Sequence, residues 1–150
     1  MRGRGRKRGA GLHRKQRLIV AAAAIAVLAA VFYFTDDPLW RAIVRVESGG
    51  NSRAWNKATD AVGVAQIRKT AVDDCNRIVG YKRFSYDDRW SRRASRRMFD
   101  IYLNHWARQY ERLTGRPATA EIRARIWNGG PDGWKVGETK EYWERVRKIY

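Results

Sequence analysis

Apolar residues recur at helical spacing from Leu39 to the end of the chain, and this pattern constrains the fold more than any other feature. The first stripe is formed by Leu39, Ala42, Ile43 and Val46. Residues three and four positions apart share one face of a helix, so each stripe predicts a helix with one buried face. No segment of any length alternates between apolar and polar residues as a strand would. We therefore expect an all-α domain over residues 36–150.

Capping residues and glycines mark where these helices begin and end. Asp36 and Asp37 precede Pro38, a residue type that favours the first turn of a helix. Thr70 followed by Asp73 resembles a capping box at the start of another helix. The expected helices cover 38–48, 70–79, about 87–110, a segment through Ile122 and Ile126, and about 139–150, with loops at 51–69 and 128–133.

A run of 17 residues without a charge, residues 18–34, precedes this domain. It follows a basic tail, residues 1–17, that holds eight Arg or Lys and no acid. Nine residues of the run are Leu, Ile, Val or Phe, each worth roughly 0.3–0.6 kcal/mol toward membrane insertion. The Ala-x-Ala sites lie too early in the run for efficient cleavage, which favours an uncleaved signal anchor over a cleaved signal peptide.

The basic tail predicts the orientation of this anchor, because positively charged flanks stay on the cytoplasmic side of a membrane. We expect a cytoplasmic tail at 1–17, a transmembrane signal anchor at 18–34 and the folded domain at 36–150. The chain is then a single-pass inner-membrane protein whose folded domain lies in the periplasm or outside the cell.

The net charge of +17 predicts a polyanionic partner: nucleic acid, anionic lipid or cell wall. The basic tail accounts for only part of this charge, since 24 basic and 15 acidic residues remain after residue 17. No nucleic-acid-binding motif is present, so we expect no nucleic-acid partner. With one cysteine, Cys75, and no His/Cys cluster, we also expect no intrachain disulfide, no metal and no cofactor.

Four short segments carry the functional signal: ESGGN at 47–51, AVGVAQI at 61–67, IWNGGP at 126–131 and TKEYWERV at 139–146. Their order and spacing resemble the goose-type lysozyme and soluble lytic transglycosylase family, which cuts the glycan strands of peptidoglycan. The resemblance extends over roughly residues 37–150. It implies a lysozyme-like helical fold that cleaves the β-1,4 bond between N-acetylmuramic acid and N-acetylglucosamine.

The resemblance implies that Glu47 is the general acid, which protonates the glycosidic oxygen as the bond breaks. Such an acid must stay protonated near neutral pH, above the ordinary glutamate pKa of about 4.3. The end of a helix disfavours a negative charge by about 0.3–1 kcal/mol, which raises a pKa by only about 0.2–0.7. We therefore expect burial in a cleft to supply the rest of the shift in the pKa of Glu47.

The resemblance also implies substrate-binding roles for residues around this acid. Tyr142 resembles the tyrosine whose hydroxyl reaches the catalytic carboxyl. The family commonly has another tyrosine before Asn-Gly-Gly, but Trp127 stands there and has no hydroxyl, so any contact of that hydroxyl with the acid is lost or moved and Tyr142 becomes more important. Each position also has a structural explanation, such as a turn glycine, a capping amide or a core tyrosine. The expected substrate-binding residues are Ser48, Gly63, Gln66, Trp127, Asn128 and Tyr142.

A second catalytic carboxylate is not obvious in the sequence. Asp60 and Asp73 are the candidates, although Asp73 is also explained by the expected capping box. A lytic transglycosylase needs only one acid/base, because a hydroxyl of the substrate attacks and forms a 1,6-anhydro-muramyl end. We therefore expect a lytic transglycosylase that acts as a monomer on peptidoglycan in wall remodelling or phage-induced lysis. A hydrolytic lysozyme that uses a second Asp, or an inactive wall-binding module, is the alternative.

Overall fold

The computed structural model describes residues 16–20 and 37–150. The chain divides into two units, Met1–Asp36 and Asp37–Tyr150. In the first unit the described residues, 16–20, are helical, and the rest of the expected anchor at 18–34 lies outside the described residues. Within the parts of the chain that the structure describes, no helix is both long enough and apolar enough to cross a membrane.

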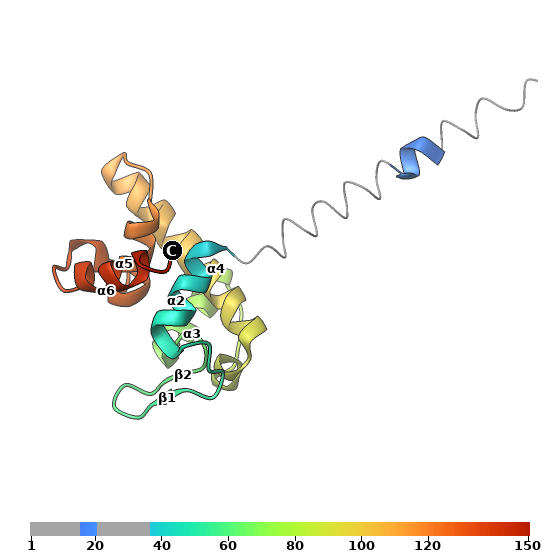
Figure 1. Cartoon of the computed structure of the whole chain (residues 1–150). Coiled ribbons are helices and arrows are strands. Elements are labelled where there is room, and N and C mark those ends of the chain that lie inside the picture. Colours follow the sequence, from blue (N-terminus) through green and yellow to red (C-terminus); the bar gives the residue numbers. More distant parts are fainter. Residues whose placement is uncertain (1–15, 21–36) are drawn as a thin grey trace, which may run out of the picture. The chain divides into compact units, whose positions relative to one another are not determined.

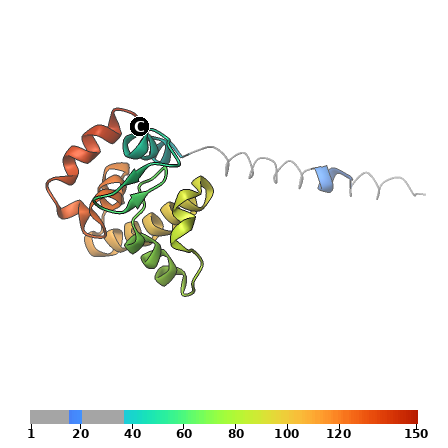
Figure 2. The same ribbon diagram turned by 90° about the horizontal axis from the view of Figure 1, so that it is seen from below.

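The second unit is mainly helical, with one small hairpin (Figures 1 and 2). The strands pair antiparallel, with Trp55 opposite Val62. The expectation of an all-α domain is therefore wrong for this hairpin, because strands of two residues are too short to show alternation. In chain order the elements are α2 (Pro38–Ser48), β1 (Trp55–Asn56), β2 (Ala61–Val62), α3 (Lys69–Val79), the 3-10 helix η1 (Tyr86–Trp90), α4 (Arg92–Thr114), α5 (Ala120–Gly129), the 3-10 helix η2 (Gly133–Lys135) and α6 (Thr139–Arg147).

Helix α2 forms as the sequence predicts. The side chain of Asp37 accepts a hydrogen bond from the backbone N–H of Leu39 at 2.9 Å, and Pro38 occupies the first turn. Gly49 ends the helix with φ +64°, in the left-handed region that favours glycine. These two caps set the end of α2 at Ser48, one residue after Glu47.

Three other expected boundaries differ from the structure. Helix α3 begins at Lys69 after an N-cap residue that makes no side-chain hydrogen bond, so the capping box of Thr70 and Asp73 is wrong. The expected helix at 87–110 is two helices, because Ser85 and Asp88 form a capping box for η1 and Ser91 starts α4. The final helix ends at 147 rather than at 150.

The helices pack around an apolar core that extends toward the site described below. Helix α5 packs against α2, α4 and α6, and α3 packs against α4. The ring of Phe99 lies 5.0 Å from that of Trp40 and 4.9 Å from that of Trp127, in tilted contacts. Trp40 is only 1% exposed, whereas Trp127 is half-buried and forms part of the cleft wall. The aromatic side chains therefore connect the centre of the core to this wall.

Candidate active site

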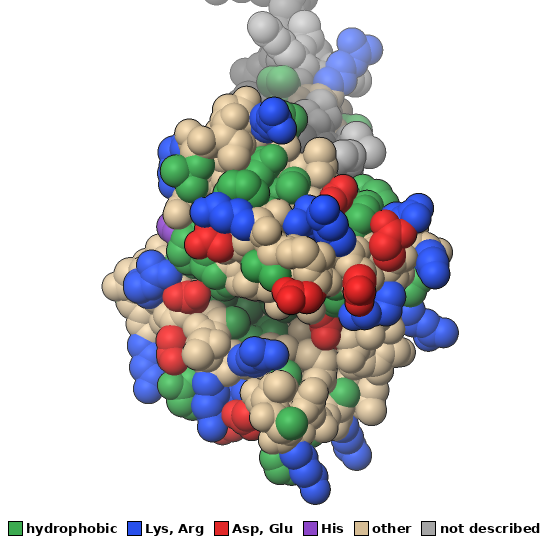
Figure 3. Space-filling model, turned by 90° about the vertical axis from the view of Figure 1, so that its left-hand side faces the viewer, with side chains coloured by type: hydrophobic (Ala, Val, Ile, Leu, Met, Phe, Trp, Pro, Cys, Tyr) green, Lys and Arg blue, Asp and Glu red, His purple; other side chains and the backbone are tan. Residues whose placement is uncertain are grey.

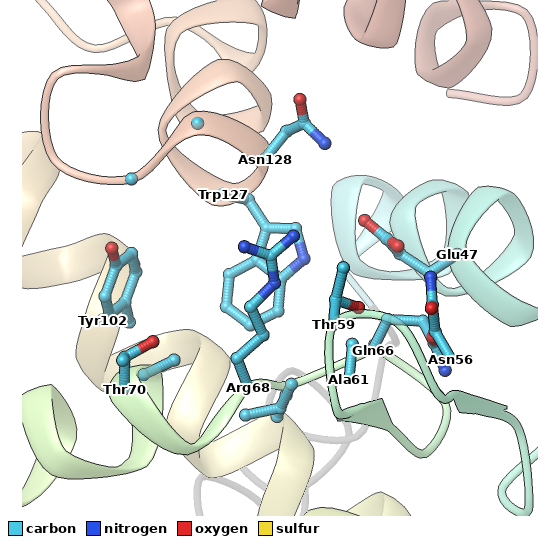
Figure 4. A pocket seen from close by; sticks show the side chains of 14 residues that line it. Glu47, Asn56, Thr59, Ala61, Gln66, Arg68, Thr70, Tyr102, Trp127 and Asn128 are labelled. Atoms are coloured by element: carbon cyan, nitrogen blue, oxygen red, sulfur yellow. The ribbon is translucent and has the colours of Figure 1, made fainter.

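A cleft of about 410 Å³ lies where several elements meet: the end of α2, the hairpin, the start of α3 and the end of α5 (Figure 4). Its volume is in the range of ordinary ligand-binding pockets. Most of its lining is polar, and it carries one carboxylate and one guanidinium. The described side chains that line it include Glu47, Asn56, Thr59, Gln66, Arg68, Thr70, Tyr102, Trp127 and Asn128.

Glu47 lines the cleft from the last turn of α2 and is half-buried. Burial raises the pKa of Glu47 above its ordinary value, while the Tyr142 hydroxyl and the positive charges of Arg145 and Arg68 act in the opposite direction. The balance lies on the side of burial, as the sequence predicts. This carboxyl can therefore hold a proton at a pH where an exposed glutamate has lost it.

Tyr142 contacts Glu47, although the two residues are 95 positions apart in the sequence. Its hydroxyl donates a hydrogen bond of 2.7 Å to Oε1 of Glu47. Tyr142 lies on α6 and is only 2% exposed, and burial raises its pKa well above the usual range. The phenol therefore stays protonated as a donor and fixes the orientation of the carboxyl.

Gln66 lines the cleft from the turn after β2, where its backbone has φ +50°. Its side-chain Nε2 donates to the carbonyls of Ala54 and Gly63, at 3.3 Å and 3.1 Å. Both amide hydrogens are thus used within the protein. The amide oxygen remains as the group that can accept a hydrogen bond from a ligand.

Ser48 and Gly63 are not among the side chains that line the cleft, contrary to what the sequence predicts. The Ser48 hydroxyl donates to the carbonyl of Val64 at 2.7 Å and ties the end of α2 to the hairpin. A Cβ at Gly63 would lie 2.1 Å from the carbonyl oxygen of Arg89. Gly63 therefore permits a close approach between two backbones of the protein, rather than between backbone and sugar.

Trp127 and Asn128 both line the cleft from the last turns of α5. The Trp127 ring is held edge-on by Tyr102, at 5.9 Å between ring centroids and 90° between ring planes. Asn128 is exposed and belongs to the helix, so the loop expected at 128–133 begins two residues later than the sequence predicts.

Neither candidate for a second catalytic carboxylate lines the cleft. Asp60 pairs with Lys69 at 3.2 Å and with Arg89 at 3.4 Å, and the hydrogen bond from Lys69 lowers the pKa of Asp60 below its ordinary value. Asp73 is exposed on α3 and accepts a hydrogen bond from the Tyr86 hydroxyl at 3.1 Å. Of the described residues that line the cleft, Glu47 alone is a carboxylate.

Sequence reasoning missed several polar residues of this cleft. Four of them lie in the hairpin or at the start of α3, segments whose direction depends on tertiary contacts rather than on a local pattern, and the fifth, Tyr102, lies on α4. The order of short motifs could have drawn attention to the residues next to AVGVAQI, but not to their orientation. The missed residues are Asn56, Thr59, Arg68, Thr70 and Tyr102.

The arrangement provides one acid with a raised pKa, hydrogen-bonding side chains and an aromatic wall. Flat aromatic rings and amide groups suit a sugar ligand, and a carboxyl with a raised pKa suits proton donation to a leaving oxygen. The described residues contain no group of three or more His, Cys, Asp or Glu that could hold a metal ion.

No family model matches the chain, but three known lysozymes of bivalve molluscs are similar to it. A lysozyme of Magallana gigas is 29% identical over 140 residues, which cover 89% of this chain and 94% of that protein. Lysozyme 1 of Crassostrea virginica is 31% identical over 109 residues, covering 71% of this chain and 55% of the relative. A lysozyme of Meretrix lusoria is 33% identical over 88 residues, covering 58% and 66%.

The fold is similar to that of a solved structure as well. A chain in the crystal structure of Aeromonas hydrophila PliI in complex with Meretrix lusoria lysozyme matches with a TM-score of 0.63 and 27% identity. The match covers 76% of this chain and 89% of the other. These similarities support the lysozyme-like class expected from the sequence, but not the goose-type or lytic transglycosylase branch in particular.

The expected location, a single-pass inner-membrane protein with its folded domain in the periplasm, is wrong. The relatives are lysozymes of bivalves, which are eukaryotes. That prediction was based on the hydropathy of residues 18–34 and on the basic tail that precedes them.

Proposed function

Because the chain is lysozyme-like in sequence and fold, we propose that it cleaves the glycan strands of peptidoglycan, with Glu47 as general acid. The bond cut is the β-1,4 link between N-acetylmuramic acid and N-acetylglucosamine. One observation carries this proposal: a half-buried carboxyl whose pKa burial raises lines a cleft of about 410 Å³ and accepts a hydrogen bond from Tyr142.

In this mechanism Glu47 transfers its proton to the glycosidic oxygen as that oxygen leaves the muramyl C1. The carboxylate that forms keeps the hydrogen bond from Tyr142, which stabilises its charge. It then takes a proton from the group that attacks C1, either a water or a hydroxyl of the substrate, so Glu47 returns to its protonated form. Gln66, Trp127 and Asn128 hold the sugars in place during these steps.

The attacking group distinguishes two candidate chemistries, and we take hydrolysis by water as the main proposal. The three relatives are lysozymes, which favours hydrolysis. Asn56 and Thr59, on the hairpin side of the cleft, are neutral groups that can orient a water. The second candidate is transglycosylation, in which the C6 hydroxyl of the muramyl sugar attacks. One observation favours it: among the described side chains of the cleft, Glu47 has no carboxylate partner.

The substitution Glu47→Gln tests the role of the acid. It is expected to reduce clearing of a peptidoglycan suspension by about 10²–10⁴-fold, the usual contribution of a positioned acid/base. Glu138→Gln is the matched control, because Glu138 is exposed and does not line the cleft. If Glu47→Gln retains the activity of the control, Glu47 is not the acid. If the wild type releases no soluble fragments, the proposal of an enzyme is rejected in favour of an inactive wall-binding module.

Mass spectrometry of the released fragments separates the two chemistries. Hydrolysis gives reducing ends of full mass, whereas transglycosylation gives anhydro ends that are lighter by one water. Fragments that all lack one water would reject the main proposal and support the second candidate, without changing the role of Glu47.

A further inference from the structure

Arg68 projects into the cleft from the residue that precedes α3, opposite Glu47 (Figure 4). Of the described residues that line the cleft, it is the only cation. Its side chain is exposed, and no ion pair, hydrogen bond or aromatic contact involves it in the described structure. The guanidinium is therefore available to a ligand, and its five N–H groups can bind a planar anion.

Arg68 is also a poor choice for the local structure. It occupies the N-cap position of α3, with φ −88° and ψ 159°, and makes no side-chain capping hydrogen bond. Ser, Thr, Asp or Asn would accept a hydrogen bond from the first turn, whereas a guanidinium has no acceptor. The position is thus occupied by a residue whose side chain does not cap the helix, which points to a use in the cleft.

We infer that Arg68 binds a carboxylate of the substrate and makes the cleft selective for muramyl glycans over neutral N-acetylglucosamine polymers. This inference rests on the proposed function. Every second sugar of peptidoglycan carries a lactyl group on an N-acetylmuramic acid. That group is a free carboxylate where no peptide is attached, and elsewhere the attached peptide brings carboxylates of its own. Chitin has the same β-1,4 linkage and acetamido groups but no carboxylate.

The two groups, Glu47 and Arg68, suit different parts of such a substrate. Glu47 is suited to the glycosidic oxygen as a proton donor, and Arg68 reaches into the same cleft from the residue before α3 (Figure 4). A ligand carboxylate paired with Arg68 would be kept away from Glu47. The substrate would therefore be held in one direction along the cleft, with the muramyl sugar on the Arg68 side.

The test measures ligand affinity in full-length protein that carries Glu47→Gln, which binds without turnover. In this background Arg68 can no longer act through the ionisation of Glu47. The probes are a peptide-free muramyl glycan fragment, the same fragment with its peptides, and a chitin tetrasaccharide. Arg68→Gln is expected to weaken binding of at least one muramyl probe by about fivefold, the upper value for an exposed ion pair, and to leave chitin binding unchanged.

Arg145→Gln is the charge-matched control. Arg145 acts on Glu47 electrostatically, and its guanidinium lies 5.5 Å from the Tyr142 ring, but it does not line the cleft. This variant should bind all three probes as the Glu47→Gln protein does. Arg68→Ser is a second variant, expected to unfold at a temperature no lower than the background because serine can cap α3. Weaker muramyl binding by this variant then cannot result from a damaged fold.

Loss confined to the peptide-free probe identifies the lactyl carboxylate, and loss confined to the peptide-bearing probe identifies a peptide carboxylate; either result supports the inference. Unchanged binding of both muramyl probes overturns it, as does an equal loss for the chitin tetrasaccharide or a matching loss in Arg145→Gln. None of these results contradicts the proposed function. The proposed function fails if the Glu47→Gln protein binds none of the three probes.

Discussion

Glu47 is subject to opposing influences on its pKa. Burial favours its neutral form, whereas the Tyr142 hydroxyl at 2.7 Å and the charges of Arg145 and Arg68 favour its ionised form. A general acid needs both states within reach, because it must donate a proton and then take one back. The raised pKa keeps a proton on Glu47 for donation, and the hydrogen bond from Tyr142 stabilises the carboxylate that must take a proton back.

The substitution Tyr142→Phe is expected to raise the pKa of Glu47 further, because it removes a donor that stabilises the carboxylate. Activity is lost as pH rises through the pKa of the acid, so the alkaline limb of the pH–rate profile should move to higher pH. Tyr110→Phe is the matched control, since Tyr110 is buried but does not line the cleft. An alkaline limb that moves to lower pH in Tyr142→Phe would contradict this account.

The raised pKa of Glu47 also makes stability depend on pH. An unfolded glutamate releases its proton near its ordinary pKa, while the folded one retains it to higher pH. The stability that Glu47 contributes is therefore complete below the unfolded pKa and is lost as pH rises through the folded pKa. Glu47→Gln should remove this loss and become more stable than wild type at alkaline pH. Parallel stability curves for the two proteins in urea titrations at several pH values would refute the prediction.

The hairpin forms one side of the cleft and is bound to η1 through Arg89. Arg89 is only 5% exposed, and its NH1 donates to the carbonyl of Asp60 at 2.8 Å while Nε donates to that of Tyr86 at 2.7 Å. The Ser48 hydroxyl joins the end of α2 to the same hairpin through Val64. The segment that carries Gln66 is therefore held in part by Arg89 and Ser48, which do not line the cleft.

Gly63→Ala is expected to disturb this packing. The added Cβ would meet the Arg89 carbonyl oxygen at 2.1 Å, and φ +78° is unfavourable for alanine. Gly115→Ala is the matched control, because φ there is +67° and nothing lies within 4 Å of an added Cβ. The control should lose about 1 kcal/mol of stability from backbone strain, and Gly63→Ala about 1–3 kcal/mol more from overpacking. Equal losses in thermal or urea unfolding would show that the hairpin can move away from η1.

The elements that could be predicted from the sequence are those with a strong local signal. Helix α2, with Asp37, Pro38 and Gly49 at its ends, needed no tertiary information, and its end places Glu47. The start of α3 was predicted wrongly because Thr70 and Asp73 have the spacing of a cap, while the chain becomes helical one residue earlier.

Site residues were predictable where the family motif carries them and not where contacts decide. Glu47, Gln66, Trp127 and Asn128 line the cleft, and Tyr142 contacts the acid. Ser48 and Gly63 were assigned to the cleft because the family motifs include them, but the structure uses both to join backbone segments. No local pattern distinguishes a serine that lines a cleft from one that closes a helix.

At the scale of the folded domain, the charge on the face shown in Figure 3 is distributed rather than gathered into one patch. Figure 3 shows Lys and Arg side chains interspersed with Asp and Glu side chains over the face in view. Many ion pairs of the described domain join partners close in sequence, such as Arg96 with Asp100 and Arg147 with Glu144. The excess of basic residues therefore acts as a diffuse field, which attracts a large anionic surface more than a single small anion.

Cleavage of intact peptidoglycan is accordingly expected to slow as salt is added. The screening length falls from about 10 Å at 0.1 M to about 3 Å at 1 M, which removes the attraction between the cationic domain and an anionic wall. Binding of a neutral chitin tetrasaccharide should change little over the same range, and it serves as the control. A rate on intact peptidoglycan that stays constant between these salt concentrations would mean that charge does not assist capture.

The hydrogen bond between Tyr142 and Glu47 joins residues 95 positions apart in the chain. Helix α6 also packs against α2, so it helps to enclose the carboxyl. During synthesis Glu47 leaves the ribosome well before α6 exists, and its carboxyl then remains in water with an ordinary pKa. A nascent chain stalled before residue 139 should release no fragments from peptidoglycan, whereas one extended beyond α6 should. The order of translation thus keeps the growing chain without activity until α6 packs against α2.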